Sequence, residues 1–292
     1  MEYINTVSFS QKLKNYKKHP FSFLAMILVA LAAIITVFVL FFIIVYILMK
    51  GIPNLKPELF EFTYNSENVS MMPAIINTFS MVFLTLVIAV PTGIFSAIYL
   101  VEYAKRGNKL VSTIRLTTET LQGIPSIVFG LFGYLLFNIA LHWRYSMLAG
   151  AITLALMVLP LIMRTTEEAL LSVPDSYREG SFGLGAGRLR TVFRVVLPSA
   201  IPGILSGIIL AIGRIVGETA ALIYTSGTVA GVPSSVMRSG RTLSVHMYML
   251  LSEGLYTNQA YATAVVLLVM VFIINGLSGL IAKHLAKGDK DE

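Results

Sequence analysis

The sequence predicts an all-α, polytopic membrane protein with six transmembrane helices and with both termini on the cytoplasmic side. Three observations lead to this prediction. Of the 292 residues, 56% are hydrophobic and only 13% are charged, whereas an average soluble domain carries about 25% charged residues. Apolar stretches long enough to cross a bilayer recur along the chain. The basic residues are also distributed unevenly between the segments that join these stretches.

The helices are predicted from stretches that lack Asp, Glu, Lys, Arg and His, because roughly 20 apolar residues span a bilayer as a helix. Five such stretches are 20–49, 68–101, 120–141, 145–163 and 254–282. A sixth, 200–224, is equally apolar except for Arg214 and Glu218. The predicted segments are a cytoplasmic N-terminal segment (1–20), a first transmembrane helix (21–49), an outer loop (50–73), a core of five transmembrane helices (74–285) that includes a cytoplasmic coupling loop (164–199), and a cytoplasmic tail (286–292).

The direction in which the chain crosses the membrane is predicted from its Lys and Arg residues. If both termini are cytoplasmic, 16 of the 22 lie in inner segments, five lie in outer segments, and Arg214 lies within a helix. Cytoplasmic loops carry the excess of basic residues in membrane proteins. We therefore expect N-in and C-in topology in a lipid membrane. The net charge of +7 then reflects topology and not a nucleic-acid partner.

Composition excludes several kinds of site. The chain contains no cysteine, which excludes disulfides, thiolate metal sites and cysteine nucleophiles. Its four histidines, at positions 19, 142, 246 and 284, are too scattered for the spacing of metal ligands. We expect no metal site. The first apolar stretch is longer than the core of a signal peptide, so we expect it to be retained as a helix.

The predicted cytoplasmic loop carries a motif of widely spaced residues. Pro174 interrupts a helix-prone stretch, and a second short helix is expected from Asp175 or Ser176 through Leu184. The motif residues are Glu179, Gly180, Ser181, Gly185, Leu197 and Pro198. Because glycine accepts a positive φ, the short helix can end in a sharp turn and lie across the membrane surface, where a soluble partner could hold it. On spacing alone, the pattern also fits an ordinary surface helix.

This motif resembles the EAA signature of ABC-transporter permeases, in which a glutamate and two small residues precede a glycine and an aliphatic-x-Leu-Pro ending. The alanines of the family are Gly180 and Ser181 here. Other segments are similar to the phosphate ABC-transporter permeases, and more to the PstA type than to the PstC type; they are PTGIFSAIYLVEYA, LQGIPSIVFGLFGYLLF, AIGRIVGETAAL and TLSVHMYMLLSEGLYTNQAYATAVVLL. The resemblance extends over residues 70–285.

The resemblance implies the fold of a type I ABC importer permease in a prokaryotic inner or plasma membrane, and ATP-driven transport of inorganic phosphate. It also implies three kinds of partner: a second permease of the PstC type, a dimer of ATP-binding subunits of the PstB type, and an external phosphate-binding protein of the PstS type. The chain itself is expected to be a transport subunit and not an enzyme. Its glycine-rich stretch 183–190 lacks the G-x4-G-K-[ST] pattern that cradles a triphosphate. We therefore expect no cofactor on this chain and ATP–Mg on the partner ATPase.

Arg214 and Glu218 are the most informative residues within a predicted span. Counted from Ala200 at 1.5 Å per residue, Arg214 lies roughly 21 Å into a hydrocarbon core of about 30 Å. A charge at that depth costs at least about 2.5 to 3.5 kcal/mol, so it should face protein or a water-filled path. Glu218, at i+4, would share the same helix face. Either the two neutralise each other, or Arg214 binds phosphate and Glu218 orients it; the resemblance places this R-x3-E arrangement in the transport path.

Other polar residues allow two interpretations. Candidates for the lining of the path are Asn77, Thr78, Gln122 and Thr219, although hydrogen bonds between packed helices are the commoner use of such residues. The last outer loop carries Arg238, Arg241 and His246. These three could form a mouth that collects anions, an ordinary solvated loop, or a surface that docks the external binding protein.

Three other functions remain open at this stage. The first is a permease for another oxyanion, such as sulfate or molybdate, because Arg214 alone would not distinguish tetrahedral anions. The second is a secondary transporter in which Glu218 titrates and couples protons; it would work without an ATPase and would leave the Glu179 loop without a role. The third is an assembly scaffold, for which Arg214 would be dispensable.

Overall fold

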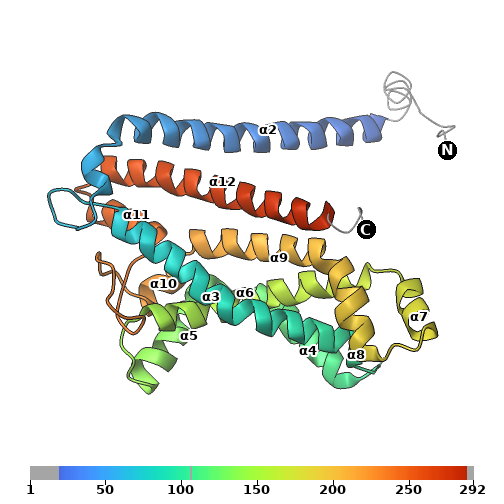
Figure 1. The fold of residues 1–292 in the computed structure, drawn as a ribbon. Helices are drawn as coiled ribbons and strands as arrows, with labels where there is room; N and C mark the ends of the chain where they lie inside the picture. The colour runs from blue at the N-terminus through green and yellow to red at the C-terminus, as the bar shows by residue number, and fades with distance from the viewer. Residues whose placement is uncertain (1–19, 106, 288–292) are drawn as a thin grey trace. The chain divides into compact units, whose positions relative to one another are not determined.

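The computed structural model describes residues 20–105 and 107–287, and within these ranges it contains helices, turns and loops but no strand (Figure 1). The predicted all-α class is therefore confirmed. In chain order the elements are α2 (Pro20–Gly51), η1 (Ile52–Asn54), η2 (Pro57–Phe60), α3 (Met72–Ile98), η3 (Tyr99–Tyr103), α4 (Lys109–Gln122), α5 (Ser126–Gly133), η4 (Tyr134–Ala140), α6 (Met147–Leu171), α7 (Asp175–Gly183), α8 (Arg188–Thr191), η5 (Val192–Val196), α9 (Leu197–Gly217), α10 (Ala220–Thr225), α11 (Leu243–Glu253) and α12 (Thr257–Lys287).

Five helical segments in the described part of the chain are long and apolar enough to cross a membrane. They are Phe21–Asn54, Met72–Tyr103, Met147–Leu171, Arg188–Gly217 and Thr257–Leu280. A sixth span exists only if α4 and the α5–η4 segment are counted together, and these two are bent by 103°. The sequence predicts one span over 120–141 with a kink at Pro125, and the structure has a full break there between two helices. Pro125 lacks an N–H and disfavours helical backbone at the residue before it, so α4 ends at Gln122 and α5 begins anew at Ser126.

The described residues divide into two compact units, 20–50 and 51–287 without residue 106. In the first, the described residues 20–50 belong to the apolar helix α2. In the second, α6 is central and packs against α3 and α9, while α12 packs against α9 and α11. The short helix α10 packs on α5, and α4 lies along α6. The segment 51–71, which is predicted to lie outside, holds η1 and η2 and no larger element.

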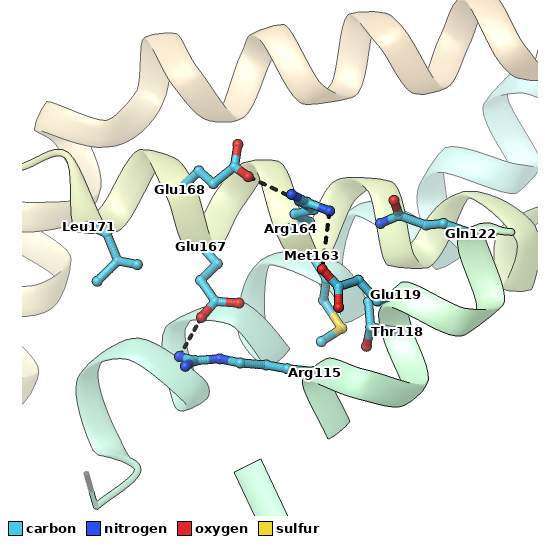
Figure 2. Close-up of a pocket in the computed structure, with 9 residues that line it drawn as sticks. All are labelled: Arg115, Thr118, Glu119, Gln122, Met163, Arg164, Glu167, Glu168 and Leu171. Atoms are coloured by element: carbon cyan, nitrogen blue, oxygen red, sulfur yellow. Dashed lines mark hydrogen bonds and ion pairs between the residues drawn. The ribbon is translucent and has the colours of Figure 1, made fainter. Parts of the chain in front are cut away.

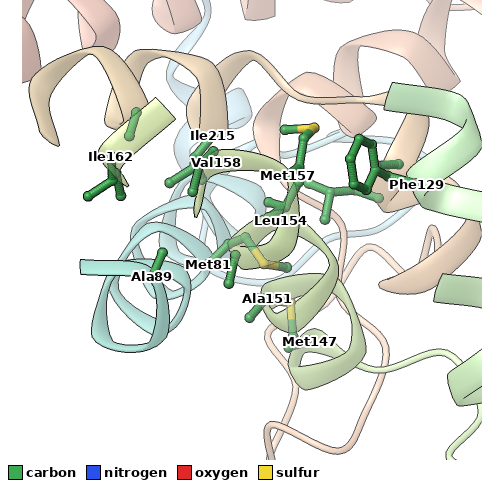
Figure 3. Packing of buried hydrophobic residues seen from close by; sticks show 14 of the residues in the cluster. Met81, Ala89, Phe129, Met147, Ala151, Leu154, Met157, Val158, Ile162 and Ile215 are labelled. Atoms are coloured by element: carbon green, nitrogen blue, oxygen red, sulfur yellow. The ribbon is translucent and has the colours of Figure 1, made fainter. Parts of the chain in front are cut away.

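The main core lies where α3, α6 and α9 meet (Figure 3). Met81 of α3, Leu154 and Val158 of α6, and Ile215 of α9 are all fully or almost fully buried there. The contact between α6 and α9 depends on a small residue, as helix packing in membranes generally does, because lipid tails are as apolar as leucine. A Cβ at Gly207 of α9 would lie only 1.9 Å from Thr165 Oγ1 of α6. This close approach holds α6 and α9 together, and both helices carry charged residues.

A second cluster of buried residues lies at the other end of these helices. It joins the end of α3, the end of α6, η5 and the start of α9; its fully buried members include Leu170, Val192 and Val196. The chain leaves α6 at this point to form α7 and then returns through α8. The cluster therefore fixes both ends of the loop that carries the predicted motif.

Candidate functional site

The helix that carries Arg214 ends three residues after it. α9 stops at Gly217, Glu218 has extended backbone with φ −71° and ψ 129°, and α10 begins at Ala220. The predicted i+4 relation of Arg214 and Glu218 on one helix is therefore wrong. The break has a local cause, because Gly217 favours helix poorly and the Glu218 carboxylate accepts a hydrogen bond from the N–H of Ala221 at 3.1 Å. Glu218 thus caps α10 instead of pairing with Arg214.

Arg214 itself is partly buried in the Arg188–Gly217 span. In the described part of the chain, no carboxylate or carbonyl accepts a hydrogen bond from its guanidinium, and no acid pairs with it. The neutralised-pair interpretation therefore has no contact to support it. An arginine offers five N–H donors in a planar fork that matches tetrahedral oxyanions. These donors remain available to a ligand.

A hydrogen bond from α11 holds the break between α9 and α10 in place. The buried hydroxyl of Ser244 donates a hydrogen bond to the Glu218 carbonyl at 2.6 Å, and it also contacts the Thr242 hydroxyl at 3.1 Å. Thr219 lies in the break, partly buried, and its hydroxyl donates to the Gly217 carbonyl at 3.4 Å. Glu218 and Thr219 therefore belong to an ordered turn between two short helical pieces.

Asn77 and Thr78 are buried packing residues in this structure, each 1% exposed. The Asn77 amide donates to the carbonyls of Gly231 and Arg241, both at 3.1 Å. The Thr78 hydroxyl accepts from the N–H of Leu243 at 2.9 Å. Asn77 thus fastens α3 to the segment before α11, and Thr78 fastens α3 to the first residue of α11. The structure therefore favours the packing interpretation for Thr78, whereas Asn77 both packs and borders a cavity.

The predicted outer mouth does not form an exposed cationic surface. Arg238 is exposed, but Arg241 is 5% exposed and His246 is completely buried. The Arg241 guanidinium lies over the ring of Tyr64, 4.7 Å from its centre, and the same ring meets His246 edge-on at 6.2 Å. Arg241 Nε and Nη2 and both ring nitrogens of His246 are buried without a hydrogen-bond partner. Burial, and secondarily the charge of Arg241, lower the pKa of His246 to about 3, so its ring is neutral at pH 7.

Sequence reasoning missed a charged pocket of about 350 Å³ between α4 and α6 (Figure 2). Arg115 of α4 pairs with Glu167 of α6. Arg164 of α6 pairs with Glu168 at 3.0 Å and reaches Glu119 of α4 at 3.7 Å. The spacing of four residues within Arg115–Glu119 and within Arg164–Glu168 is the signal that could have revealed this network. Because three carboxylates surround two arginines that are already paired, the pocket does not attract an anion in this arrangement.

Gln122 lines the same pocket at the end of α4. Its side-chain amide donates a hydrogen bond to the carbonyl of Pro160 in α6 at 3.2 Å. Of the four predicted lining residues, Gln122 and Asn77 each border a cavity found in the described residues, Gln122 this one and Asn77 one of about 220 Å³ beside Met147 and Pro233. Each of the two also joins two parts of the chain by hydrogen bonds.

The predicted motif lies on α7 and the segment after it. The helix ends in a turn in which Gly185 has φ +83° and its N–H donates to the Phe182 carbonyl at 2.9 Å. Ser181 is tied to Thr191 of α8 by a 2.8 Å hydroxyl contact. Glu179 and Gly180 are exposed. A short helix with a glycine turn was expected here, and the structure has one.

The end of the motif differs from expectation. Leu197 and Pro198 open α9 directly after the π-helix η5, so the helical span runs from Arg188 and not from about Ala200. Pro198 stands in the first turn of α9, where a missing N–H is tolerated, and the wider turn before it lets the helix continue. The loop proper is therefore shorter than the predicted 164–199.

α7 presents large apolar side chains to its surroundings. Tyr177 is 51% exposed, Phe182 46% and the following Leu184 91%, and no residue of α7 is buried. Such a helix gains little stability from packing on its own chain. Exposed apolar side chains gathered on one short element are typical of an interaction surface.

Comparison with known proteins places this architecture among transport permeases. The family model described as binding-protein-dependent transport system inner membrane component matches residues 89–287. The fold is also that of a bacterial alginate ABC transporter, solved in complex with an alginate pentasaccharide-bound periplasmic protein: the TM-score is 0.69, at 15% identity, over 93% of this chain and 98% of that one. The fold thus defines a multi-pass permease of the ABC importer class, and the predicted type I fold is confirmed.

Within that class, the chain belongs to the family of binding-protein-dependent transport system inner membrane components. It is 34% identical to the probable ABC transporter permease protein YqgI of Bacillus subtilis, over 79% of this chain and 84% of the relative. It is 30% identical to the phosphate transport system permease protein PstA of Haemophilus influenzae, over 94% of this chain and 98% of the relative. The predicted resemblance to PstA-type permeases and the location in a cell membrane are confirmed.

Proposed function

We propose that this chain is the PstA-type permease subunit of an ATP-driven importer that carries inorganic phosphate into the cell by alternating access. A PstC-type permease would form the other half of the path, a PstB-type dimer would hydrolyse ATP–Mg on the cytoplasmic side, and a PstS-type protein would deliver phosphate outside. This chain binds no cofactor in the proposal. The excess of Lys and Arg in the inner segments supports the inward direction.

The observation that carries the proposal is the state of Arg214. It is a guanidinium within a membrane span, and it has no acidic partner in the described residues. A charge at such a position faces a polar path, because contact with lipid would be too unfavourable. Charge-assisted hydrogen bonds in two-pronged geometry are the usual way in which arginine binds phosphate. The names of the PstA relatives support phosphate as that anion.

The surface of α7 supports the coupling part of the proposal. Its exposed Tyr177 and Phe182 would fill a groove of the ATPase, and Glu179 would meet a basic residue there. The positive φ of Gly185 sets the angle at which α7 leaves the loop. α7 and the residues Glu179, Gly180, Ser181 and Gly185 would then transmit the ATPase motion to the spans that begin at Leu197 and Pro198.

The test is phosphate uptake by proteoliposomes that hold the complete complex with Arg214→Gln. The amide keeps hydrogen-bonding capacity but no charge, so uptake should fall about 10- to 100-fold, the effect of losing a hydrogen bond to a charged group. The matched control is Arg238→Gln, an exposed outer arginine, which should transport normally. Normal uptake by an assembled Arg214→Gln complex would show that Arg214 is not the ligand.

A further inference from the structure

Arg178, in the middle of α7, connects that helix to two membrane spans. Its Nε and Nη2 donate hydrogen bonds to Glu102 Oε1 at 3.2 and 2.8 Å. Nη2 also donates to the Leu170 carbonyl at 2.9 Å, and Nη1 donates to the Val173 carbonyl at 2.8 Å. A longer contact of 3.3 Å joins Nη1 to Asp175 within α7. The guanidinium is thus almost fully engaged.

The acceptors belong to three different parts of the chain. Glu102 lies in η3, the last turn of the Met72–Tyr103 span. Leu170 is in the last turn of α6, where carbonyls lack the regular partner one turn further on, and Val173 is in the linker to α7. One side chain therefore binds together the ends of two spans and the helix that follows them.

Burial makes this contact different from a surface ion pair. The side chains of Arg178 and Glu102 are 13% and 9% exposed, whereas Asp175 is 78% exposed. Exposed pairs contribute little and are screened by salt, but a pair that is largely withdrawn from water and has its remaining donors satisfied holds one geometry. Arginine suits this task because its planar fork reaches several acceptors at once, which the single ammonium of lysine does not do.

Apart from Arg178, α7 has few polar contacts that hold it. No residue of α7 belongs to the buried clusters, although α7 packs against α8 and η5. Its other side-chain hydrogen bond to a neighbouring element in the described chain is the hydroxyl pair Ser181–Thr191. A push on α7 would therefore reach the ends of α3 and α6 through Arg178 and through the three-residue linker before α7. Without Arg178, the linker and the packing of α7 on α8 and η5 would remain, and the buried polar connection to Glu102 and Leu170 would be lost.

We propose that Arg178 is a positioning residue for energy coupling, and that its clamp on Glu102, Leu170 and Val173 makes α7 move as one body with the ends of α3 and α6. This inference depends on the proposed function, in which α7 docks the ATPase. It assigns Arg178 and Glu102 a role in transmission that neither phosphate binding nor ATP hydrolysis requires of them.

The test compares wild type with Arg178→Gln plus Glu102→Gln in the reconstituted complex. Because both charges are removed, no buried charge remains without a partner. The chain should therefore fold and retain its ATPase subunits. The expected result is ATP hydrolysis that continues while phosphate taken up per ATP falls about tenfold, the equivalent of one lost charge-assisted interaction. The phosphate uptake per ATP of Arg178→Lys should lie between the values for wild type and the double variant. The matched control is Asp175→Asn, which removes only the exposed contact and should leave the ratio unchanged.

A second measurement keeps the proposal testable if the double variant loses its ATPase. Spin labels at Ser176→Cys in α7 and Phe95→Cys in α3 can be placed in the otherwise cysteine-free chain, held in lipid nanodiscs. The distance distribution should be narrow in the wild-type background and clearly broader in the double variant. An unchanged width, or a wild-type coupling ratio in the double variant, would overturn the clamp. Failure of the proposed function is separable, because then the wild-type complex itself would not take up phosphate.

Discussion

At the scale of single residues, Arg178 and Arg214 have opposite surroundings, and their proposed roles differ accordingly. The donors of Arg178 are used by three other parts of the chain, whereas Arg214 has no partner in the described residues. A guanidinium whose donors are all hydrogen-bonded within the chain stabilises the fold, and one in a span whose donors have no partner is available to a ligand. From the contacts of each side chain, and not from the residue type, we therefore propose positioning for Arg178 and anion binding for Arg214.

His246 leads to a prediction about pH. Its pKa is lowered to about 3 in the folded chain from 6.5, so the unfolded chain binds the additional proton between these values. Stability should therefore fall as the pH is lowered through 6.5 toward 3. His246→Gln should flatten this slope of melting temperature against pH, measured by intrinsic fluorescence between pH 7.5 and 5. The same change at the exposed His142 is the control; an equal slope in both variants would contradict the assignment.

At the residue scale, the sequence predicted which side chains are unusual but not which of them meet. Arg214 was found from its apolar surroundings, yet its pairing with Glu218 assumed a continuous helix that Gly217 ends. The burial of Arg241 and His246 depends on Tyr64, which is remote in sequence. Contacts between distant segments leave no periodic signal along the chain, so hydropathy and spacing could not predict them.

At the scale of elements, composition predicts where some helices lie, whereas the backbone preferences of single residues determine where others end. The long spans follow from apolar length, and α7 follows from the break at Pro174 and the turn at Gly185. The third span follows only in part, because Pro125 predicts a kink there but apolar length does not predict a bend of 103°. The segment from α4 to η4 therefore contributes an amphipathic helix beside α6, and with it the charged pocket that a straight helix would not form.

The turn after α7 gives a prediction about how α7 binds the ATPase subunit. Gly185 has φ +83°, and a residue with a Cβ in this left-handed region costs about 1–2 kcal/mol, with β-branched residues the worst suited. Gly185→Val should leave the protein inserted in the membrane but reduce co-purification of the ATPase subunit. Gly183→Ala, at a helical glycine with open space around it, is the control. Equal recovery of the ATPase with both variants would contradict the role of the turn.

The contact between α6 and α9 provides a prediction about stability. A Cβ at Gly207 would meet Thr165 Oγ1 at 1.9 Å, so Gly207→Ala must force the two helices apart and should destabilise the chain by about 1–3 kcal/mol. Gly276→Ala in α12 has nothing within 4 Å and should be tolerated. Thermal unfolding of both variants in detergent checks this. A melting temperature for Gly207→Ala as high as that of Gly276→Ala would show that the close approach is not required.

At the scale of the whole molecule, the fold is that of an ABC importer permease, and its orientation is the prediction on which the direction of transport depends. Single cysteines can be placed at exposed positions of the cysteine-free chain. Cysteines at Ser66 and Ser235 should react with a membrane-impermeant reagent in intact cells, and those at Asn108 and Leu184 only after permeabilisation. The reverse pattern would invert the topology and place α7 outside, away from any ATPase.

The most direct test of the central claim is ATP-dependent uptake of labelled phosphate by proteoliposomes that contain this chain with its second permease, ATPase and external binding protein. Uptake should require ATP on the side of α7 and the presence of the ATPase, and a tenfold excess of phosphate, but not of sulfate or molybdate, should compete. Uptake that persists without the ATPase would indicate a secondary transporter, and equal competition by sulfate would indicate a different oxyanion. Either result would contradict the assignment of this chain as a phosphate ABC-importer permease.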